Sequence, residues 1–235
     1  MDDIVIPQLE KNSLEFPHPS QANEDGILAW DGDLSPSRLI HAYENGIFPW
    51  YSKGDPIIWW SPNPRLIMEL KDFKLSKSLK KSIKKFNYKF DTSFIKVITA
   101  CKEKKRENQE GTWITTDIIK AYNTLKSMGY VHSIGSYYND KLVGGVYGVV
   151  VGSVFCGESM FSNKPDASKA AYAVLIQHLK EWGYDFIDCQ VPTNHLKSLG
   201  AKEVSRDYFL YRLKKSNMNK IDNIWKINNS LIDTI

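Results

Sequence analysis

The stretch HSIGSYYNDKLVGGVYGVVVGSVFCGESM, residues 132–160, consists of three successive runs rich in β-branched, aromatic and small residues. Asn139 and Asp140 separate the first two runs, and both residue types favour the backbone of a two-residue hairpin turn. We therefore predict strands over the ranges 132–138, 141–151 and 153–160. Strands joined by such short turns pair antiparallel, so this stretch predicts a mostly antiparallel sheet.

Helical patterns occur on both sides of these strands. Apolar periodicity and capping residues predict helices over 36–45, 76–86, 93–104, 116–128, 167–182 and 194–199. Two further strands are predicted over 186–191 and 208–213. This order of elements indicates an α+β domain. Residues before position 62 are richer in Pro, Gly, Asp and aromatic types, so we expect a small N-terminal lobe over 1–62 and a larger domain over 63–235.

Composition and the N-terminal residues narrow the class of protein. The chain has 235 residues, of which 42% are hydrophobic and 12% aromatic. This content is enough to bury a core, and it excludes disordered and fibrous classes. Residues 1–7 lack the basic and apolar segments of a leader, and the longest apolar run, near 146–151, is too short to span a bilayer. We expect a soluble, cytoplasmic protein without a membrane partner.

Cysteine and histidine patterns do not indicate a metal site or a disulfide framework. The three cysteines, Cys101, Cys156 and Cys189, are an odd number and form no CxxC pair. No HExxH motif and no Cys/His cluster occurs. We therefore expect buried free thiols and no metal.

A lysine-rich segment is the most strongly charged part of the chain. Between Lys71 and Lys89 there are eight lysines and one acidic residue, Asp72. Apolar residues recur at helical spacing, and Ser76 is a suitable N-cap. The outward face could follow a phosphate backbone, or it could be an ordinary solvated helix face. The candidate backbone-binding residues are Lys77, Lys80, Lys81, Lys84 and Lys85.

Polar groups stand at the ends of segments that otherwise have the composition of buried core. Glu158 lies between Gly157 and Ser159 in an apolar strand. Asp188 and Gln190 are two residues apart on a predicted strand, so we expect their side chains to share one face. Polar groups in such a setting usually belong to a site, although they can also satisfy neighbouring backbone groups.

Several motifs together resemble one known family. The resemblance runs in order from about Phe16 to Tyr208 and covers most of the chain. The family is that of the leucyl/phenylalanyl-tRNA protein transferases. The matching strings are GIFPW (46–50), WWSP (59–62) with Pro64 and Arg65, GTWIT (111–115), GGVYG (144–148), FCGESMFS (155–162) and DCQ (188–190).

The resemblance implies a fold, a reaction and its partners. It implies a GNAT-like acyltransferase domain that carries a small N-terminal lobe. The implied donor is an aminoacyl-tRNA, and no other cofactor is expected. The implied activity is transfer of Leu, and less readily Phe or Met, to the α-amino group of proteins that begin with Arg or Lys. Such transfer would mark these proteins for degradation by the N-end rule.

Catalytic roles follow from the resemblance and from elementary chemistry. An α-amino group has a pKa of about 7.7 to 8.0, so a useful fraction is neutral near pH 7.5 and a strong base is not required. The resemblance implies that Gln190 contacts the attacking amine and that Asp188 polarises or positions it. A carboxamide is a very weak base, so we interpret Gln190 as an orienting acceptor and leave proton uptake to Asp188, water or the substrate. Glu158 is our candidate for binding the acceptor's cation, and an internal ion pair with Lys169 or Arg65 is the alternative.

Two apolar groups are candidates for holding the donor. The residues that match the family's aminoacyl pocket are Val146, Phe155, Met160, Tyr172 and Leu175. Three of them depart from the usual Met, Leu and Phe, namely Val146, Tyr172 and Leu175, which leaves the ranking of Leu over Phe open. All five could instead be ordinary core. For stacking the terminal adenosine, the aromatic candidates are Trp50, Trp113 and Tyr43, whereas Trp59 and Trp60 are expected to be core.

Two other classes of function are alternatives for this chain. A CoA-dependent N-acetyltransferase of the same fold would need a glycine-rich loop at a helix N-terminus, and the helix that begins near Ala167 lacks it. A non-catalytic tRNA-binding protein would explain the lysine-rich helix but would leave Glu158, Asp188 and Gln190 without a role. His195 could assist proton transfer, although a histidine on a helix surface is the simpler interpretation.

Overall fold

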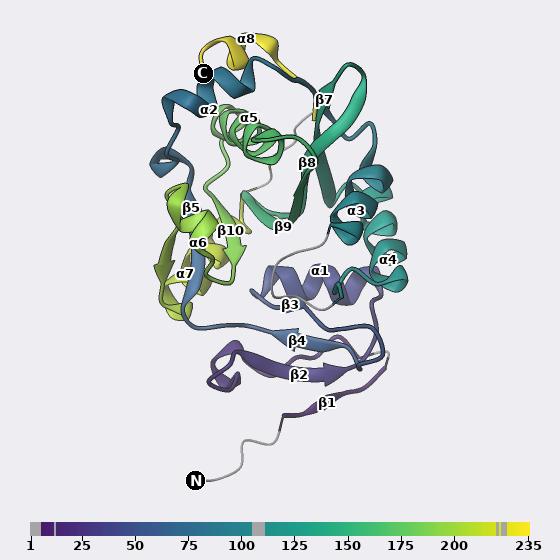
Figure 1. Cartoon of the computed structure of the whole chain (residues 1–235). Coiled ribbons are helices and arrows are strands. Elements are labelled where there is room, and N and C mark those ends of the chain that lie inside the picture. Colours follow the sequence, from purple (N-terminus) through teal and green to yellow (C-terminus); the bar gives the residue numbers. More distant parts are fainter. Residues whose placement is uncertain (1–5, 12, 105–110, 220, 222–224) are drawn as a thin grey trace.

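Two β-sheets form the framework of the computed structural model, which describes residues 6–11, 13–104, 111–219, 221 and 225–235. The smaller sheet has four short strands in the order β1-β2-β4-β3 and lies at one end of the molecule (Figure 1). Its strands are β1 (Gln8–Leu9), β2 (Ile27–Asp31), β3 (Phe48–Pro49) and β4 (Ile58–Trp60). Helix α1 (Pro36–Glu44) lies between this sheet and the rest of the chain (Figure 1).

The larger sheet has seven strands in the order β11-β5-β10-β9-β8-β7-β6. Strands β9 and β10 pair in parallel, and every other neighbouring pair is antiparallel. The prediction of a mostly antiparallel sheet is therefore confirmed. The strands are β5 (Arg65–Glu69), β6 (Asn87–Phe90), β7 (Val131–Tyr138), β8 (Lys141–Val151), β9 (Val154–Ser162), β10 (Phe186–Gln190) and β11 (Lys202–Val204).

Helices cover both faces of the larger sheet. Helix α5 (Ala167–Glu181) packs on one face, together with α2 (Lys77–Ile83) and α8 (Asn229–Asp233). Helices α3 (Phe94–Glu103) and α4 (Thr116–Ser127) pack on the other face, next to α1. The remaining elements are α6 (Asn194–Ser198), α7 (Arg206–Ser216) and the 3-10 helices η1 (Pro19–Gln21) and η2 (Leu70–Asp72).

Alternation along β8 separates two hydrophobic cores. Val146 belongs to the core under α5, whereas Tyr147 and Val149 belong to the core that α3, α4 and the smaller sheet share. Glycine at position 144 lets the start of α5 approach β8, because a Cβ atom there would lie 2.6 Å from the Ala167 Cβ. The two cores fix β9 and β10 between them, and these strands carry most of the candidate site.

The structure corrects part of the secondary structure expected from sequence. The range 208–213, predicted as a strand, lies within α7, because Ser205 caps a helix in which Phe209 and Leu213 share the buried face. The helix predicted over 76–86 ends at Ile83, and the next residues turn into strand β6. The other predicted helices and strands are present with shifts of a few residues at their ends. The short strands of the smaller sheet were not predicted, and neither were β5, β6, β11 and helix α8.

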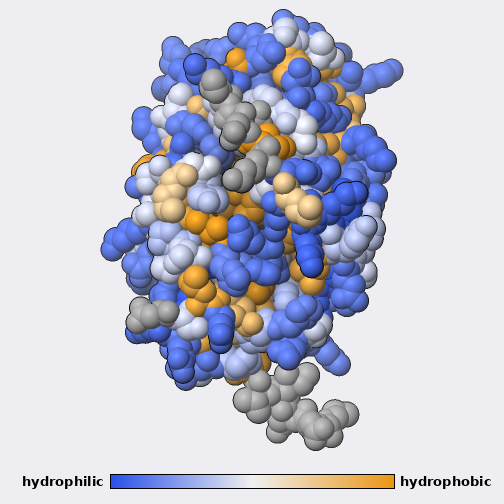
Figure 2. Space-filling view, turned by 180° about the vertical axis from the view of Figure 1, so that it is seen from behind, coloured by the Kyte–Doolittle hydropathy of each residue, from blue (hydrophilic) through white to orange (hydrophobic). Residues whose placement is uncertain are grey.

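The smaller sheet lies wholly before residue 62 and the larger one wholly after it. Among the described residues, no helix combines the length and apolarity that crossing a membrane requires. Residues 1–5, which entered the expectation about a leader, lie outside the described part. The face opposite to that in Figure 1 is mostly hydrophilic, with apolar residues gathered near its middle (Figure 2).

Candidate active site

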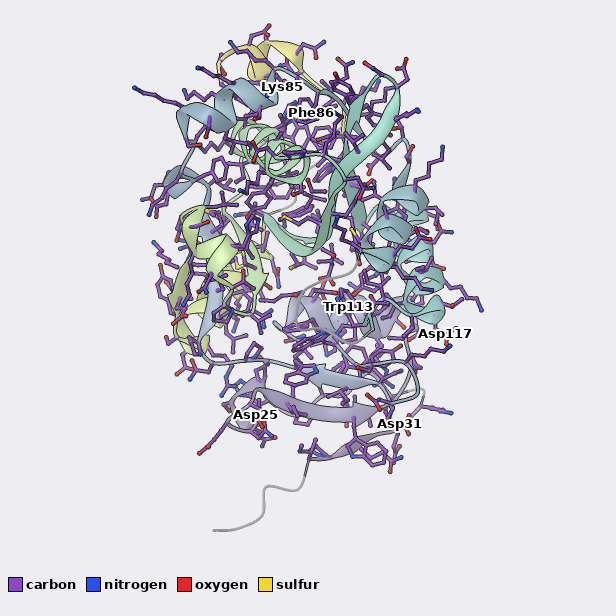
Figure 3. All side chains as sticks on the ribbon, in the orientation of Figure 1. Asp25, Asp31, Lys85, Phe86, Trp113 and Asp117 are labelled. Carbon is purple, nitrogen blue, oxygen red and sulfur yellow. The ribbon has the colours of Figure 1, made fainter. Side chains whose placement is uncertain are left out.

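A cavity of about 760 Å³ lies between the end of β10 and strand β3 of the smaller sheet. Trp113, one of its lining residues, lies in the central part of the molecule (Figure 3). Strands β3, β8, β9 and β10 and helices α5 and α6 all contribute to the lining. The lining residues are Phe48, Pro49, Trp50, Trp113, Val146, Gly157, Glu158, Ser159, Met160, Tyr172, Ile187, Cys189, Gln190, Val191, Pro192, Thr193, His195 and Leu196.

Glu158 and Gln190 are hydrogen-bonded to each other in this cavity. The Gln190 Nε2 amide donates to Glu158 Oε1 at 2.8 Å, and the Tyr122 hydroxyl donates to Glu158 Oε2 at 3.3 Å. The Tyr43 hydroxyl is in turn hydrogen-bonded to the Tyr122 hydroxyl. Within the described part of the chain, no Lys, Arg or His forms an ion pair with Glu158.

Burial without a cation raises the pKa of Glu158. Desolvation is the largest cause, and the negative charge of Asp188 adds to it. Hydrogen bonds from Tyr43, Tyr122 and Gln190 lower the pKa in part. The net result is a pKa of about 7 for the Glu158 carboxyl. Near neutral pH this carboxyl can therefore be either ionised or protonated. Burial and the nearby Glu158 charge raise the pKa of the Tyr43 and Tyr122 hydroxyls well above the ordinary value. Both hydroxyls are therefore protonated near neutral pH and are poor acids.

Asp188 is buried against Arg65. Its carboxylate accepts two hydrogen bonds from Arg65, from Nε at 2.8 Å and from Nη2 at 2.7 Å, and both side chains are 1% exposed. Asp188 Oδ1 also accepts the backbone N–H of Gln190 at 2.9 Å. Asp188 does not line the cavity, whereas Gln190 does.

The expectation that Asp188 and Gln190 share a strand face is wrong. The pairing register with β5 shifts between them, and Gln190 has the left-handed φ of 62°. A bulge of this kind interrupts the two-residue alternation, so the two side chains point to different surroundings. The ion pairs considered for Glu158 are also absent: Arg65 is bound to Asp188, and Lys169 lies 3.9 Å from Asp166.

Three of the five predicted aminoacyl-pocket residues, Val146, Met160 and Tyr172, line the cavity. Phe155 and Leu175 do not; each is 1% exposed and belongs to the core under α5. Trp225 from the C-terminal segment packs on Phe155, with ring centroids 6.0 Å apart.

The aromatic candidates divide in the same manner. Trp50 and Trp113 line the cavity, and Trp50 keeps 36% of its surface exposed. Tyr43 is 1% exposed and its hydroxyl is bonded to Tyr122, so neither face of its ring is open to a base. Trp59 is fully buried, as expected, and Trp60 supports Trp50 by donating its indole N–H to the Trp50 carbonyl at 2.6 Å.

The lysine candidates form a separate exposed group. All five are exposed, and Lys84 and Lys85 follow the end of α2. Lys85 lies at the end of the molecule that is far from the smaller sheet, whereas Trp113 lies near the middle (Figure 3). None of the five lines the cavity.

Some residues of the site were not predicted from sequence. Tyr122 occupies a buried position of α4 beside Ile118 and Leu125. The one sequence signal for Tyr122 is that a buried tyrosine hydroxyl needs a hydrogen-bond partner.

His195 is exposed on α6, in agreement with the simpler interpretation, and it also lines the cavity. Desolvation first, and then the charge of Lys169, lower the pKa of His195.

No group of three or more His, Cys, Asp or Glu side chains is placed to hold a metal ion within the described residues. All three cysteines are free and buried. The polar side chains that line the cavity thus supply a carboxyl, a carboxamide and hydroxyl groups. Val146, Met160 and the Tyr172 ring form its apolar wall. Such a set can bind and orient an amine and an apolar side chain.

Comparison with known proteins gives consistent matches over the chain. The profile of the family described as leucyl/phenylalanyl-tRNA protein transferase matches residues 67–214, and the profile of that family's N-terminal domain matches residues 32–63. The leucyl/phenylalanyl-tRNA–protein transferase of Sulfurimonas denitrificans is 68% identical over 223 residues, which cover 95% of this chain and 98% of the relative. The corresponding protein of Nitrosospira multiformis is 48% identical over 214 residues, covering 90% and 92%.

Similarity to solved structures is low. The structure of L-PGS from Bacillus licheniformis aligns with a TM-score of 0.37 at 12% identity, over 88% of this chain and 70% of that one.

Proposed function

The chain belongs to the leucyl/phenylalanyl-tRNA protein transferase family and is an enzyme, and from this premise we propose its substrates and the roles of its residues. The proposed donor is leucyl-tRNA, with phenylalanyl- and methionyl-tRNA used less readily. The proposed acceptor is the α-amino group of proteins that begin with Arg or Lys, which would direct them to N-end rule degradation in the cytoplasm. The hydrogen-bonded pair of Glu158 and Gln190, which faces a cavity with an apolar wall, is the observation that carries this proposal.

The donor is proposed to bind along the apolar side of the cavity. Trp50, which is 36% exposed, and Trp113, which is 8% exposed but lines the same cavity, would stack the terminal adenine, a contact of about 1 to 3 kcal/mol per base. Val146, Met160 and Tyr172 would then surround the aminoacyl side chain. The exposed lysines of α2 would bind phosphates of the tRNA, at a distance from the reacting ester.

The acceptor is proposed to bind at the polar side. Because Gln190 donates its amide N–H to Glu158, its side-chain oxygen is left to accept a hydrogen bond from the incoming amine. Glu158 lacks a cation among the described residues, so an ammonium or guanidinium group of the acceptor would supply the missing partner. Asp188 would act through the backbone of Gln190, since Arg65 holds both of its oxygens.

The reaction itself is an aminolysis. The amine nitrogen attacks the ester carbonyl, the C–N bond forms, the bond to the ribose oxygen breaks, and one proton passes from the nitrogen to that oxygen. Orientation of the neutral amine supplies much of the acceleration in such a reaction. We also propose that the domain around the larger sheet is GNAT-like, on the strength of the sequence resemblance.

The test is transfer of labelled leucine from leucyl-tRNA to a peptide that begins with Arg. Matched reactions contain the same peptide with a blocked α-amine, a peptide that begins with Ala, or acetyl-CoA in place of the donor. Label that appears only with leucyl-tRNA and a free amine supports the proposal. Tight tRNA binding without transfer, or acetylation from acetyl-CoA, would overturn it in favour of an RNA-binding protein or an acetyltransferase.

A further inference from the structure

Arg65 joins three parts of the molecule. Its guanidinium lies between two rings, 4.8 Å from the centroid of Phe48 on β3 and 4.5 Å from that of Phe209 on α7. The guanidinium nitrogens Nε and Nη2 also donate hydrogen bonds to the two oxygens of Asp188 on β10. One side chain at the start of β5 therefore contacts the smaller sheet, helix α7 and the strand that carries the site.

The contact with Asp188 reaches Gln190 through the backbone. Asp188 Oδ1 accepts the N–H of Gln190, whose φ of 62° lies in the left-handed region. A residue other than glycine adopts this conformation at a cost of about 1 kcal/mol or more, so it persists only where neighbouring contacts hold it. The bidentate pair with Arg65 fixes the carboxylate that holds it. The direction of the Gln190 side chain towards Glu158 depends on this backbone.

The contact with Phe48 reaches the opposite wall of the cavity. Phe48, Pro49 and Trp50 are consecutive residues that all line it. Arg65 therefore packs against the segment that carries Trp50 while it binds the strand that carries Gln190. These two residues belong to the proposed donor site and the proposed acceptor site.

Stability alone does not account for this arrangement. Replacing a buried ion pair by apolar residues of similar volume is often neutral or stabilising, because both charges must be desolvated. In addition, the third guanidinium nitrogen, Nη1, is buried without a hydrogen-bond partner in the part of the chain that the structure describes. A planar fork between two rings does, however, fix direction and distance better than apolar packing does.

We propose that Arg65 is a positioning residue for the transfer reaction: it sets the placement of Gln190 relative to Trp50, through Asp188 on one side and Phe48 on the other. This inference rests on the proposed function, because it concerns the alignment of donor and acceptor. A misplacement of about 1 Å can lower a rate roughly 100-fold without loss of binding. Disturbing Arg65 should therefore lower kcat far more than it changes KM.

The first variants are Arg65→Lys and Arg65→Met, which keep the charge or the apolar stem but lose the fork. The matched control is Arg212→Met. Arg212 pairs with Glu69 of the same strand at 2.9 Å and lies 5.0 Å from the Phe186 ring, but it does not contact Asp188. For both Arg65 variants we expect kcat to fall about 100-fold, with KM for leucyl-tRNA and for the peptide changed less than about threefold. The control should retain its kcat.

Rescue separates positioning from mere folding. Arg65→Gly should leave a slot beside Phe48, Phe209 and Asp188. Guanidinium ion fits this slot, because it has the planar fork of donors that binds a carboxylate, whereas methylammonium lacks that fork and serves as the control. We expect millimolar guanidinium to restore kcat at least about tenfold in Arg65→Gly while the melting temperature stays constant, and to leave Arg212→Gly unchanged. Two outcomes would overturn the proposal. In the first, Arg65→Gly has a lowered melting temperature but a normal kcat per folded molecule. In the second, guanidinium restores the melting temperature of Arg65→Gly but not its kcat.

A second route covers Arg65 variants that fail to fold. Phe48→Leu keeps the ion pair but removes the ring that links Arg65 to the donor wall, and it should lower kcat several-fold with normal folding. An unchanged kcat in Phe48→Leu would count against the proposal in the same way. If the unaltered protein transfers no leucine, the proposed function fails; if it does and these variants do too, only the role of Arg65 fails.

Discussion

Gln190 Nε2 donates a hydrogen bond of 2.8 Å to Glu158 Oε1, across the gap between the parallel strands β10 and β9. An ionised carboxylate only accepts hydrogen bonds, so this contact assigns the amide nitrogen of Gln190 to Glu158 and its oxygen to the cavity. The acceptor amine therefore meets an oxygen from Gln190 and the charge of Glu158 at once. Each of these two groups can be removed separately.

Gln190→Met removes the amide at nearly constant length. We expect kcat to fall about 10- to 100-fold, because the amine loses its orienting acceptor and Glu158 loses a donor. Binding of leucyl-tRNA should change little. Single-turnover transfer from preloaded enzyme measures the step directly, and Gln8→Met, which removes an exposed contact with Asp31, is the control. A normal single-turnover rate in Gln190→Met would contradict the role given to this side chain.

Glu158→Gln should make stability less dependent on pH. The folded pKa of about 7 lies above the ordinary value of 4.5, so this carboxyl favours the folded state below pH 4.5 and loses that contribution as the pH rises through 7. At pH 8 the folded protein holds a poorly solvated charge, and the neutral amide should be more stable by about 1 to 3 kcal/mol. At pH 4 the gain should vanish. Urea unfolding at both pH values measures the difference, with the exposed Glu203→Gln as control.

The same substitution should affect the choice of acceptor. With ionised Glu158 as the partner of the acceptor's cation, KM for an Arg-initiated peptide should fall as the pH rises through about 7. In Glu158→Gln this trend should disappear, together with the preference for Arg- over Ala-initiated peptides. Steady-state kinetics with both peptides between pH 6 and pH 8.5 test it, and retention of the full preference would exclude Glu158 as the recognition group.

Sequence patterns predicted four of the seven strands of the larger sheet and most helices, because their signals are local. Hairpin turns, caps and apolar periodicity act over a few residues, as at Asn139, Ser35 and Ser76. One failure, the range 208–213, had a local signal in the Ser205 cap, whereas the failure at Asp188 and Gln190 involves a distant partner. Arg65 and Asp188 are separated by 123 residues, and their contact lies where the pairing of β10 with β5 shifts register.

The same reasoning explains which site residues were found. Glu158 and Gln190 are polar residues in apolar segments, which is a local signal, and both line the cavity. Phe155 and Tyr43 are residue types expected in such a pocket, but both are buried. Phe155 packs against Trp225, and the Tyr43 hydroxyl is hydrogen-bonded to Tyr122. Whether an aromatic ring is exposed depends on tertiary contacts that a single sequence does not encode locally.

Tyr172 is expected to limit the size of the donor side chain. Its ring lines the cavity, and its hydroxyl lies 3.7 Å from Cys189 Sγ, so the ring is held in place. Tyr172→Leu should enlarge the apolar wall and raise the efficiency with phenylalanyl-tRNA relative to leucyl-tRNA by about 10-fold, since such pocket changes discriminate by about 1 to 3 kcal/mol. Competition between the two charged tRNAs measures the ratio. Leu175→Ala, a buried change away from the cavity, should lower stability without altering this ratio.

The exposed lysines on α2 and directly after it should govern the salt dependence of tRNA binding. Each phosphate contact releases counterions, so replacing Lys80 and Lys84 by Gln should reduce the slope of log K against log salt by about 1.4 to 1.8. Because these residues lie outside the cavity, kcat at saturating leucyl-tRNA should not change. Filter binding between 50 and 300 mM salt measures the slope, and Gln at Lys214 and Lys215 of α7 provides a charge-matched control. An equal loss of slope in both double variants would mean that net charge, and not the α2 face, attracts the tRNA.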